Sequence, residues 1–312
     1  MLPVFESILP VFLVIVLGNV LRRLPLLGDA GWLGVEQLGY WVLYPALLFS
    51  SILHADFTGL RLDAILGALL MSITLLAAFV LVTWPGWKRA SNVTPGEFSS
   101  VFQTAIRWNA FIALAVAQKI FPPAGTAVVA LAMAVIIVPL NVMSVTVVAH
   151  FGAREADWPK VLKATATNPL ILAVLAGVAM RWLPGGLYEP VDRTIGLVAG
   201  AAIGMGLITI GAGLRVSDMF RLRLIIWFPV IVKLVLLPAL LGATAWVLGV
   251  RGPEFVYLVL CGAVPTAMNG YTLARQLGGD PALYAAITTL QTMLAALTMP
   301  VALALAAQFA SG

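Results

Sequence analysis

The sequence predicts an all-α membrane protein, with ten transmembrane helices arranged as two inverted five-helix repeats. Three observations support this prediction: a very apolar composition, ten apolar stretches of membrane-spanning length, and a match between the two halves of the chain. The chain has 312 residues, of which 62% are hydrophobic and 10% are charged, and its mean hydropathy is +1.04. Because typical soluble domains are only about 45 to 50% apolar, the composition excludes a water-soluble globular protein.

The apolar stretches have the length that a bilayer requires. The hydrocarbon core is about 30 Å thick, and a helix of roughly 20 residues crosses it. Between clusters of charge, glycine and proline we find ten such stretches, and the loops between them leave no room for a soluble domain. They run roughly over residues 4–21, 33–53, 63–84, 98–120, 125–149, 168–183, 194–214, 224–249, 254–277 and 283–308. The first stretch lacks a small-residue cleavage pattern, so we expect it to remain as a helix.

Basic residues are distributed unevenly between the loops on the two sides. With the N-terminus outside, 11 of the 18 lysines and arginines fall in inner loops and 5 in outer loops, while Arg107 and Lys233 fall within spans. The positive-inside rule therefore predicts a multi-pass protein of the plasma membrane, the inner membrane in a bacterium, with its N-terminus outside. The formal net charge of +5 follows from this topology, and it does not imply binding of nucleic acid.

The residues that commonly support catalysis or metal binding are scarce. Cys261 is the only cysteine, and the two histidines, His54 and His150, lie far apart in the sequence. We therefore expect no internal disulfide, no metal cluster and no cofactor. The spans contain neither paired aspartates nor a His-Glu-x-x-His motif, so the sequence predicts a protein that is not an enzyme.

An internal repeat relates the two halves. The segments "LPVFLVIVLGNVLRRLP" (9–25) and "NPLILAVLAGVAMRWLP" (168–184) align at a constant offset of 159 residues. The shared positions are Pro10 with Pro169, Gly18 with Gly177, Arg22 with Arg181, Leu24 with Leu183 and Pro25 with Pro184. Five spans in each half imply that the second copy is inverted in the membrane. We predict a first repeat over 1–150, a cytoplasmic connector over 151–163 and a second repeat over 164–312.

Inverted repeats are typical of secondary transporters, whose binding sites lie on broken helices near the middle of the bilayer. The offset carries Asn109 to position 268, one residue from Asn269, and both asparagines lie mid-run in the fourth span of their half. Pro265 removes a backbone donor, which favours a break in the ninth span. The predicted break in the fourth span depends on Arg107 and Asn109 alone.

Each polar residue of the spans also has a structural interpretation. Asn109 and Asn269 could join helices by interhelical hydrogen bonds of about 0.6 to 2 kcal/mol, which is the role that we expect for Gln103, Asn141 and Gln291. Arg107 could reach the inner interface if the fourth span begins later. Lys233 lies mid-span, where a charge costs about 2.5 to 3.5 kcal/mol and is usually functional; the structural alternative is pairing with a backbone carbonyl.

The charges within the membrane favour an anionic substrate. All 13 acidic residues fall in loops or near span ends, so coupling to protons or sodium through carboxylates is disfavoured, although neutral oxygens could still hold sodium. Export of one negative charge from an inside-negative cell gains about 2.3 kcal/mol per 100 mV, which favours export driven by the membrane potential. An ion-coupled symporter remains an alternative, and a channel or a ligand sensor is the competing class.

Several motifs together resemble the auxin efflux carrier family of membrane transporters. They are "ILPVFLVIVLGNVLRR", "YPALLF" (44–49), "RWN" (107–109), "NPLILAVLAG" (168–177) and "PTAMNGYTLARQLGGD" (265–280). The resemblance covers essentially the whole chain. It implies a scaffold domain and a transport domain, each drawn from both repeats, with crossing broken helices 4 and 9 as in bile-acid/sodium symporters, and alternating access of an elevator type.

The resemblance also implies a small organic acid anion as substrate, auxin-like or a dicarboxylate. The family pattern carries over to Arg107, Asn109, Pro265 and Asn269, and Lys233 adds a second positive charge as a candidate substrate ligand. Trp108 is the departure, because a small residue is usual at that position. The expected partners are the substrate and the lipid bilayer, and the sequence leaves open whether the protein forms a homodimer.

Overall fold

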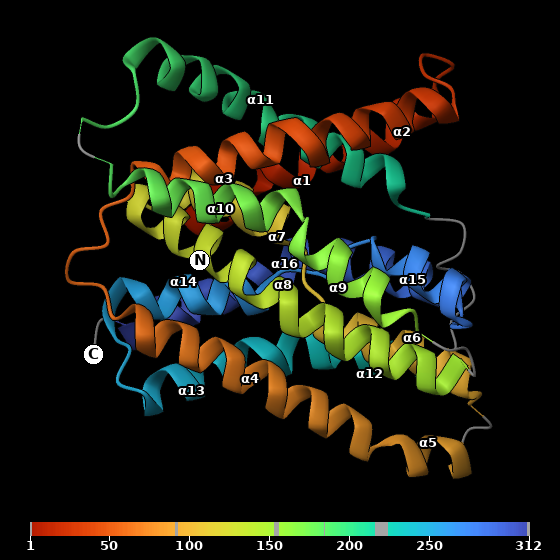
Figure 1. Ribbon diagram of the computed structural model, residues 1–312. Coiled ribbons are helices and arrows are strands. Elements are labelled where there is room, and N and C mark those ends of the chain that lie inside the picture. The colour runs from red at the N-terminus through yellow and green to blue at the C-terminus, as the bar shows by residue number, and fades with distance from the viewer. Residues whose placement is uncertain (1, 91–92, 153–155, 184, 216–223, 311–312) are drawn as a thin grey trace.

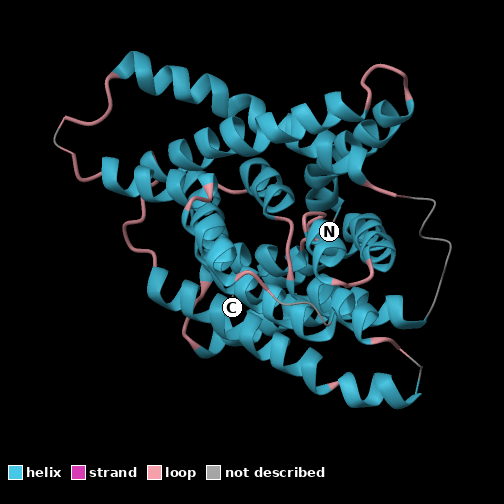
Figure 2. Ribbon diagram, turned by 45° about the vertical axis from the view of Figure 1, so that its right-hand side comes forward, coloured by secondary structure: helices cyan, strands magenta, loops and turns pink. Residues whose placement is uncertain are grey.

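The computed structural model describes residues 2–90, 93–152, 156–183, 185–215 and 224–310. Within these ranges the chain is helical and contains no strand (Figure 2). Several residues of the sequence argument lie outside the described part: Arg154 and Glu155 of the predicted connector, Pro184 of the repeat, and Asp218, Arg221 and Arg223.

Two sets of helices form the two halves of the chain (Figure 1). The first comprises α1 (Leu2–Arg23), α2 (Asp29–Leu38), the π-helical turn η1 (Gly39–Leu43), α3 (Tyr44–Leu53), α4 (Leu62–Val82), α5 (Trp84–Ala90), α6 (Pro95–Ile106), α7 (Ala110–Ile120) and α8 (Pro123–Gly152). The second comprises α9 (Trp158–Ala166), α10 (Pro169–Met180), α11 (Glu189–Gly213), α12 (Leu224–Ile231), the π-helical turn η3 (Val232–Leu236), α13 (Leu237–Val247), α14 (Gly252–Ala263), α15 (Gly270–Leu277) and α16 (Pro281–Ala310).

Each of the ten stretches expected from the sequence is helical over most of its length. Seven helical spans of the described residues are long and apolar enough to cross a membrane, and an eighth counts if α9 and α10, which bend by 40° at their junction, form one span. The two expected spans that are missing from this count, 33–53 and 254–277, consist of shorter helical segments. The protein is therefore a multi-pass membrane protein, while the number of ten crossings stays a prediction.

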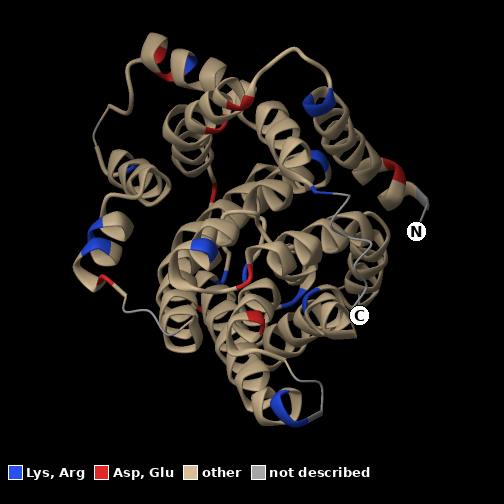
Figure 3. Cartoon of the chain, turned by 90° about the vertical axis from the view of Figure 1, so that its right-hand side faces the viewer, with Lys and Arg blue, Asp and Glu red and all other residues tan. Residues whose placement is uncertain are grey.

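The helices form two groups (Figure 1). We call α1, α2, α3, α10 and α11, in the upper part of Figure 1, the panel; α1 packs against α11, and α10 packs against α3. The other helices form the core bundle, in which α6, α7 and α8 lie beside α14, α15 and α16. Charged positions are sparse along the helices, as Figure 3 shows from the side on which α5 and α15 lie.

Two glycines allow the close helix packing within the panel. A Cβ atom on Gly18 of α1 would collide with the carbonyl of Ile208 in α11, and one on Gly177 of α10 would lie 3.1 Å from the carbonyl oxygen of Phe49 in α3. Only a residue without a side chain tolerates a backbone this close. Gly18 and Gly177 are 159 residues apart, and so are Phe49 and Ile208. The offset that aligns the two halves therefore relates one contact to the other.

Candidate functional site

Two helices of the core bundle are interrupted where the sequence predicts. The fourth span is broken between Ile106, where α6 ends, and Ala110, where α7 begins. The ninth is broken between Ala263, where α14 ends, and Gly270, where α15 begins. Arg107 begins the first break with extended backbone angles, φ −68° and ψ 154°. Both predicted helix breaks are confirmed.

The two interrupted segments cross each other in direct contact. The backbone N–H of Asn109 donates to the carbonyl oxygen of Pro265 at 2.7 Å. The hydroxyl of Thr266 donates to the carbonyl oxygens of Arg107 at 2.8 Å and of Thr104 at 3.1 Å. Because the ends of broken helices leave backbone groups without helical partners, these bonds satisfy groups that would otherwise be buried and unpaired.

Gln291 of α16 holds the crossing together. Its Nε2 donates to the carbonyl oxygens of Thr104 and Pro229, each at 3.0 Å, and its Oε1 accepts from the backbone N–H of Thr266 at 3.0 Å. The side chain is fully buried. The expectation that Gln291 joins helices is confirmed. Gln103, for which the same role was expected, has no hydrogen-bond partner among the described residues.

Arg107 is buried at the crossing, with 8% of its surface exposed. Its Nη1 donates to Oδ1 of Asn269 at 3.3 Å and its Nη2 to Oδ1 of Asn141 at 3.4 Å, both longer than usual for such bonds. Its Nε has no partner, and no carboxylate of the described residues forms a salt bridge with it. The alternative that Arg107 extends toward the membrane interface does not fit this burial.

The two asparagines differ in their surroundings. Asn109 is 3% exposed, and its Oδ1 accepts from the backbone N–H of Ile112 at 3.2 Å, so it caps the first turn of α7. Its Nδ2 has no acceptor among the described residues. Asn269 is exposed and offers its Oδ1 to Arg107. Trp108, between the two polar residues of the first break, is buried. The structure thus brings Arg107, Asn109, Pro265 and Asn269 into one site.

Lys233 does not join this hydrogen-bond network. It lies in the π-helical turn η3, is fully buried, and its Nζ has no hydrogen-bond partner among the described residues. The alternative of pairing with a backbone carbonyl is therefore wrong for the structure described. Its connection to the crossing is indirect, because the carbonyl of Pro229, one helical turn earlier, accepts from Gln291.

Thr266 was not predicted as a site residue, although the offset of 159 residues pairs it with Arg107. Residues 107 and 266 are separated by this offset, so the predicted repeat pairs them, and they form a hydrogen bond with each other. The offset from Arg107 is therefore the signal in the sequence that points to Thr266.

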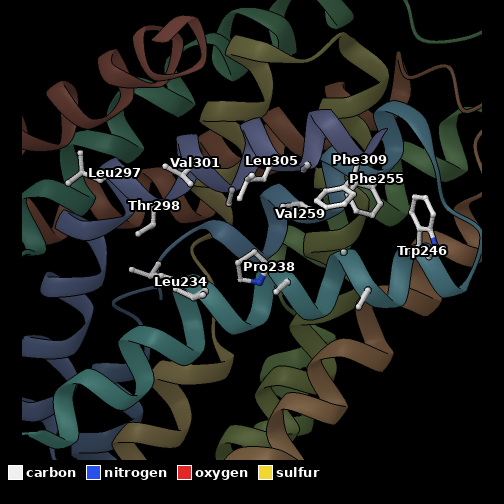
Figure 4. A pocket seen from close by; sticks show the side chains of 16 residues that line it. Leu234, Pro238, Trp246, Phe255, Val259, Leu297, Thr298, Val301, Leu305 and Phe309 are labelled. Atoms are coloured by element: carbon white, nitrogen blue, oxygen red, sulfur yellow. The ribbon is translucent and has the colours of Figure 1, made fainter. Parts of the chain in front are cut away.

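A cavity away from the crossing does not suit a charged ligand. This groove of about 860 Å³ runs between α13, α14 and α16 and is lined by apolar side chains such as Pro238, Phe255 and Leu305 (Figure 4). Thr298 is among the lining residues, and no charged residue is. Because an organic anion needs polar or charged partners when it leaves water, we assign the candidate site to the crossing.

Comparisons with known proteins relate the chain to membrane transporters. Residues 158–303 match the family described as membrane transport protein. The chain is 24% identical over 304 residues to an "Uncharacterized transporter" of Methanothermobacter thermautotrophicus, which covers 95% of this chain and 96% of the relative. It is 33% identical over 114 residues, 36% of each chain, to a "Putative malonate transporter" of Rhizobium meliloti. The second half of the chain is therefore similar to the membrane transport protein family and the chain as a whole is similar to a transporter, in agreement with the motifs that resemble the auxin efflux carrier family.

Proposed function

We propose that the protein is a secondary transporter, not an enzyme, that moves a small organic acid anion across the membrane by alternating access. The substrate's carboxylate binds Arg107 at the crossing. One observation supports this proposal above the others: a buried guanidinium group lies between the two broken helices, and no carboxylate of the described residues neutralises it.

The energetics favour a bound anion at this position. A buried charge without a partner costs several kcal/mol, and the removal of one partner from a buried pair typically costs about 3 to 5 kcal/mol. A substrate carboxylate would supply the missing negative charge, with charge-assisted hydrogen bonds of about 1.5 to 3 kcal/mol each. The helices α7 and α15 also begin at the crossing, and helix N-termini attract anions.

The neighbouring residues complete the proposed site. Nδ2 of Asn109 supplies a further donor, while Asn269 holds Arg107 in place and faces the accessible side of the crossing. Pro265 keeps the ninth span broken and presents its carbonyl to Asn109. Lys233 adds a second positive charge to the core bundle and raises its attraction for anions, although it makes no hydrogen bond to the other four residues.

Paired contacts support the inverted repeat and the elevator mechanism that we propose. Gly18 meets Ile208 as Gly177 meets Phe49, at the same offset that relates Arg107 to Thr266. A twofold axis in the membrane plane through the crossing would generate such pairs. In this proposal the panel is the fixed scaffold, and the core bundle carries the site from one side of the membrane to the other.

The proposed driving force is the membrane potential. No acidic residue lies mid-span in the sequence, so export of an anion needs no coupling ion and gains about 2.3 kcal/mol per charge per 100 mV. Symport with sodium or protons is the second candidate, and a channel is the third. Because the Rhizobium meliloti relative is named for malonate, a small dicarboxylate is the first substrate to test.

Transport into liposomes tests the proposal. We expect purified protein to support saturable malonate flux with counterflow, and we expect the flux to follow an imposed potential without a sodium or proton gradient. Arg107→Gln should abolish saturable flux, whereas Arg89→Gln, a loss of the same charge on the exposed surface of α5, should not. Unsaturable current would indicate a channel, and an absolute need for sodium or protons would indicate the symporter.

A further inference from the structure

A second cavity lies in the panel, where the ends of α1 and α11 meet. It has a volume of about 560 Å³ and is lined by Asn19, Arg22 and Arg23 of α1 and by residues 212–215 at the end of α11. Three of its lining residues are arginines: Arg22, Arg23 and Arg215. All three lie at span ends that the distribution of basic residues assigns to the cytoplasm.

Hydrogen bonds give this cavity a defined wall. Nδ2 of Asn19 donates to the carbonyl oxygens of Gly211 at 3.1 Å and Leu214 at 3.2 Å, so the end of α11 is fixed against α1. Oδ1 of the same side chain accepts from Nη2 of Arg23 at 3.0 Å, which holds that guanidinium at the cavity. The site is therefore formed by paired backbone and side-chain groups from two helices.

The charges of the cavity favour an anion. Arg22 forms a salt bridge with Asp29, whose side chain is largely exposed, which offsets one of the three positive charges. The C-terminal ends of α1 and α11 oppose an anion with about half a charge each. The arginines contribute three full charges against these terms, so a net positive potential remains in a concave site, which concentrates small anions.

The cavity adjoins the crossing. The backbone N–H of Arg215 donates to the hydroxyl of Thr289 in α16 at 3.1 Å, and its guanidinium carbon lies 4.7 Å from the centre of the Tyr271 ring in α15. A Cβ atom on Gly213 would lie 3.9 Å from Cγ of Met268. Because Met268 directly precedes Asn269, one wall of the cavity touches the broken segment that contributes to the proposed substrate site.

We propose that this arginine-lined cavity is a cytoplasmic collecting site, which binds the substrate's carboxylate before it passes to Arg107. The inference rests on the proposed function, because it requires an anionic substrate. An oxyanion of the same chemistry is also present in the phosphate of an anionic lipid. We assign the site to the substrate, because the cavity borders the crossing through Gly213 and Arg215.

The KM for malonate, measured separately from each face of the membrane, tests this inference. Malonate uptake is measured in inside-out vesicles, where the cytoplasmic face is outside, and in right-side-out vesicles. We expect Arg215→Gln, and more strongly Arg23→Gln with Arg215→Gln, to raise KM about 3- to 10-fold from the cytoplasmic face only, with kcat unchanged. The effect should shrink at high salt, because exposed charges are screened beyond about 10 Å at 0.1 M.

A control variant and a change of lipid make the outcome decisive. The double variant Lys88→Gln with Arg89→Gln removes two charges from α5 on the same predicted side and should leave KM at the parental value. An unchanged KM in the cytoplasmic-face assay, or an equal rise on both faces, would overturn the inference. A rise that occurs with phosphatidylglycerol vesicles and vanishes with phosphatidylcholine alone would assign the site to lipid and also overturn it.

The result is separable from a failure of the proposed function. If Arg107→Gln abolishes transport while the cavity variants behave like the parent, the collecting site is wrong and the transport site stands. If Arg107→Gln transports normally, the proposed function fails instead. If the double variant unfolds, Arg215→Gln alone is the test, because among the described residues the contact recorded for the Arg215 side chain is with the Tyr271 ring. Thermal unfolding of each purified variant checks its stability.

Discussion

Gln291→Leu should destabilise the protein by loosening the crossing. The substitution keeps the approximate volume of the side chain but removes all three hydrogen bonds that Gln291 makes to the backbone of Thr104, Pro229 and Thr266. The N–H of Thr266 loses the acceptor described for it, whereas the carbonyl of Thr104 keeps the hydroxyl of Thr266.

The magnitude follows from these partners. A buried donor without an acceptor costs about 1 to 3 kcal/mol, and each of the other two bonds contributes about 0.5 to 1.5 kcal/mol. We therefore expect the free energy of unfolding to fall by about 2 to 6 kcal/mol. We also expect transport to decline, because the two broken segments lose the side chain that joins them.

Denaturant unfolding of the purified protein in detergent, followed by circular dichroism, measures the change. Thr298→Val is a matched control on the same helix, because its hydroxyl is buried without a described partner and its removal should be neutral or slightly stabilising. If Gln291→Leu is as stable as the parent and Thr298→Val, Gln291 does not hold the crossing together.

Three further predictions concern other parts of the molecule. Lys233→Met should raise stability, because it removes a buried charge without a described acceptor, and should lower malonate transport; raised stability with unchanged transport would contradict its functional role. Gly18→Ala should lower the unfolding temperature because its Cβ collides with α11, whereas Gly200→Ala, with open space around it, should be neutral or stabilising by up to about 1 kcal/mol. Hydrogen bonds from Thr58 hold the pKa of Asp56 below its ordinary value of 3.8. The contribution of Asp56 to the free energy of unfolding is therefore present above pH 3.8 and is lost as the pH falls through the folded pKa. The unfolding temperatures of the parent and Asp56→Asn should converge at that low pH, and a constant difference at all pH values would contradict this.

The position of the crossing was predictable because polar residues and a proline interrupt apolar runs. Asn109 and Pro265 each have a local effect on the backbone, as a cap and as a missing donor, and local effects can be read from the sequence. The direct bond between the two breaks was not predicted, although the repeat placed the breaks at equivalent positions.

The partners of individual side chains were not predictable in the same way. Gln103 and Gln291 are both glutamines within apolar helices, yet one has no described partner and the other joins three backbone segments. The difference arises from which distant helix packs against each residue, and helical periodicity does not specify that packing. The π-helical turn at Lys233 likewise leaves no clear pattern in the sequence, because it adds one residue to an otherwise continuous apolar helix.

Binding of a small dicarboxylate to Arg107 is the central claim, and calorimetric titration of malonate into the purified protein tests it most directly. Loss of a charge-assisted hydrogen bond of about 1.5 to 3 kcal/mol predicts that Arg107→Gln weakens binding roughly 10- to 150-fold. The control Arg89→Gln should bind malonate like the parent. Equal affinity of the parent and Arg107→Gln for malonate would contradict the claim that the substrate supplies the missing partner of this buried charge.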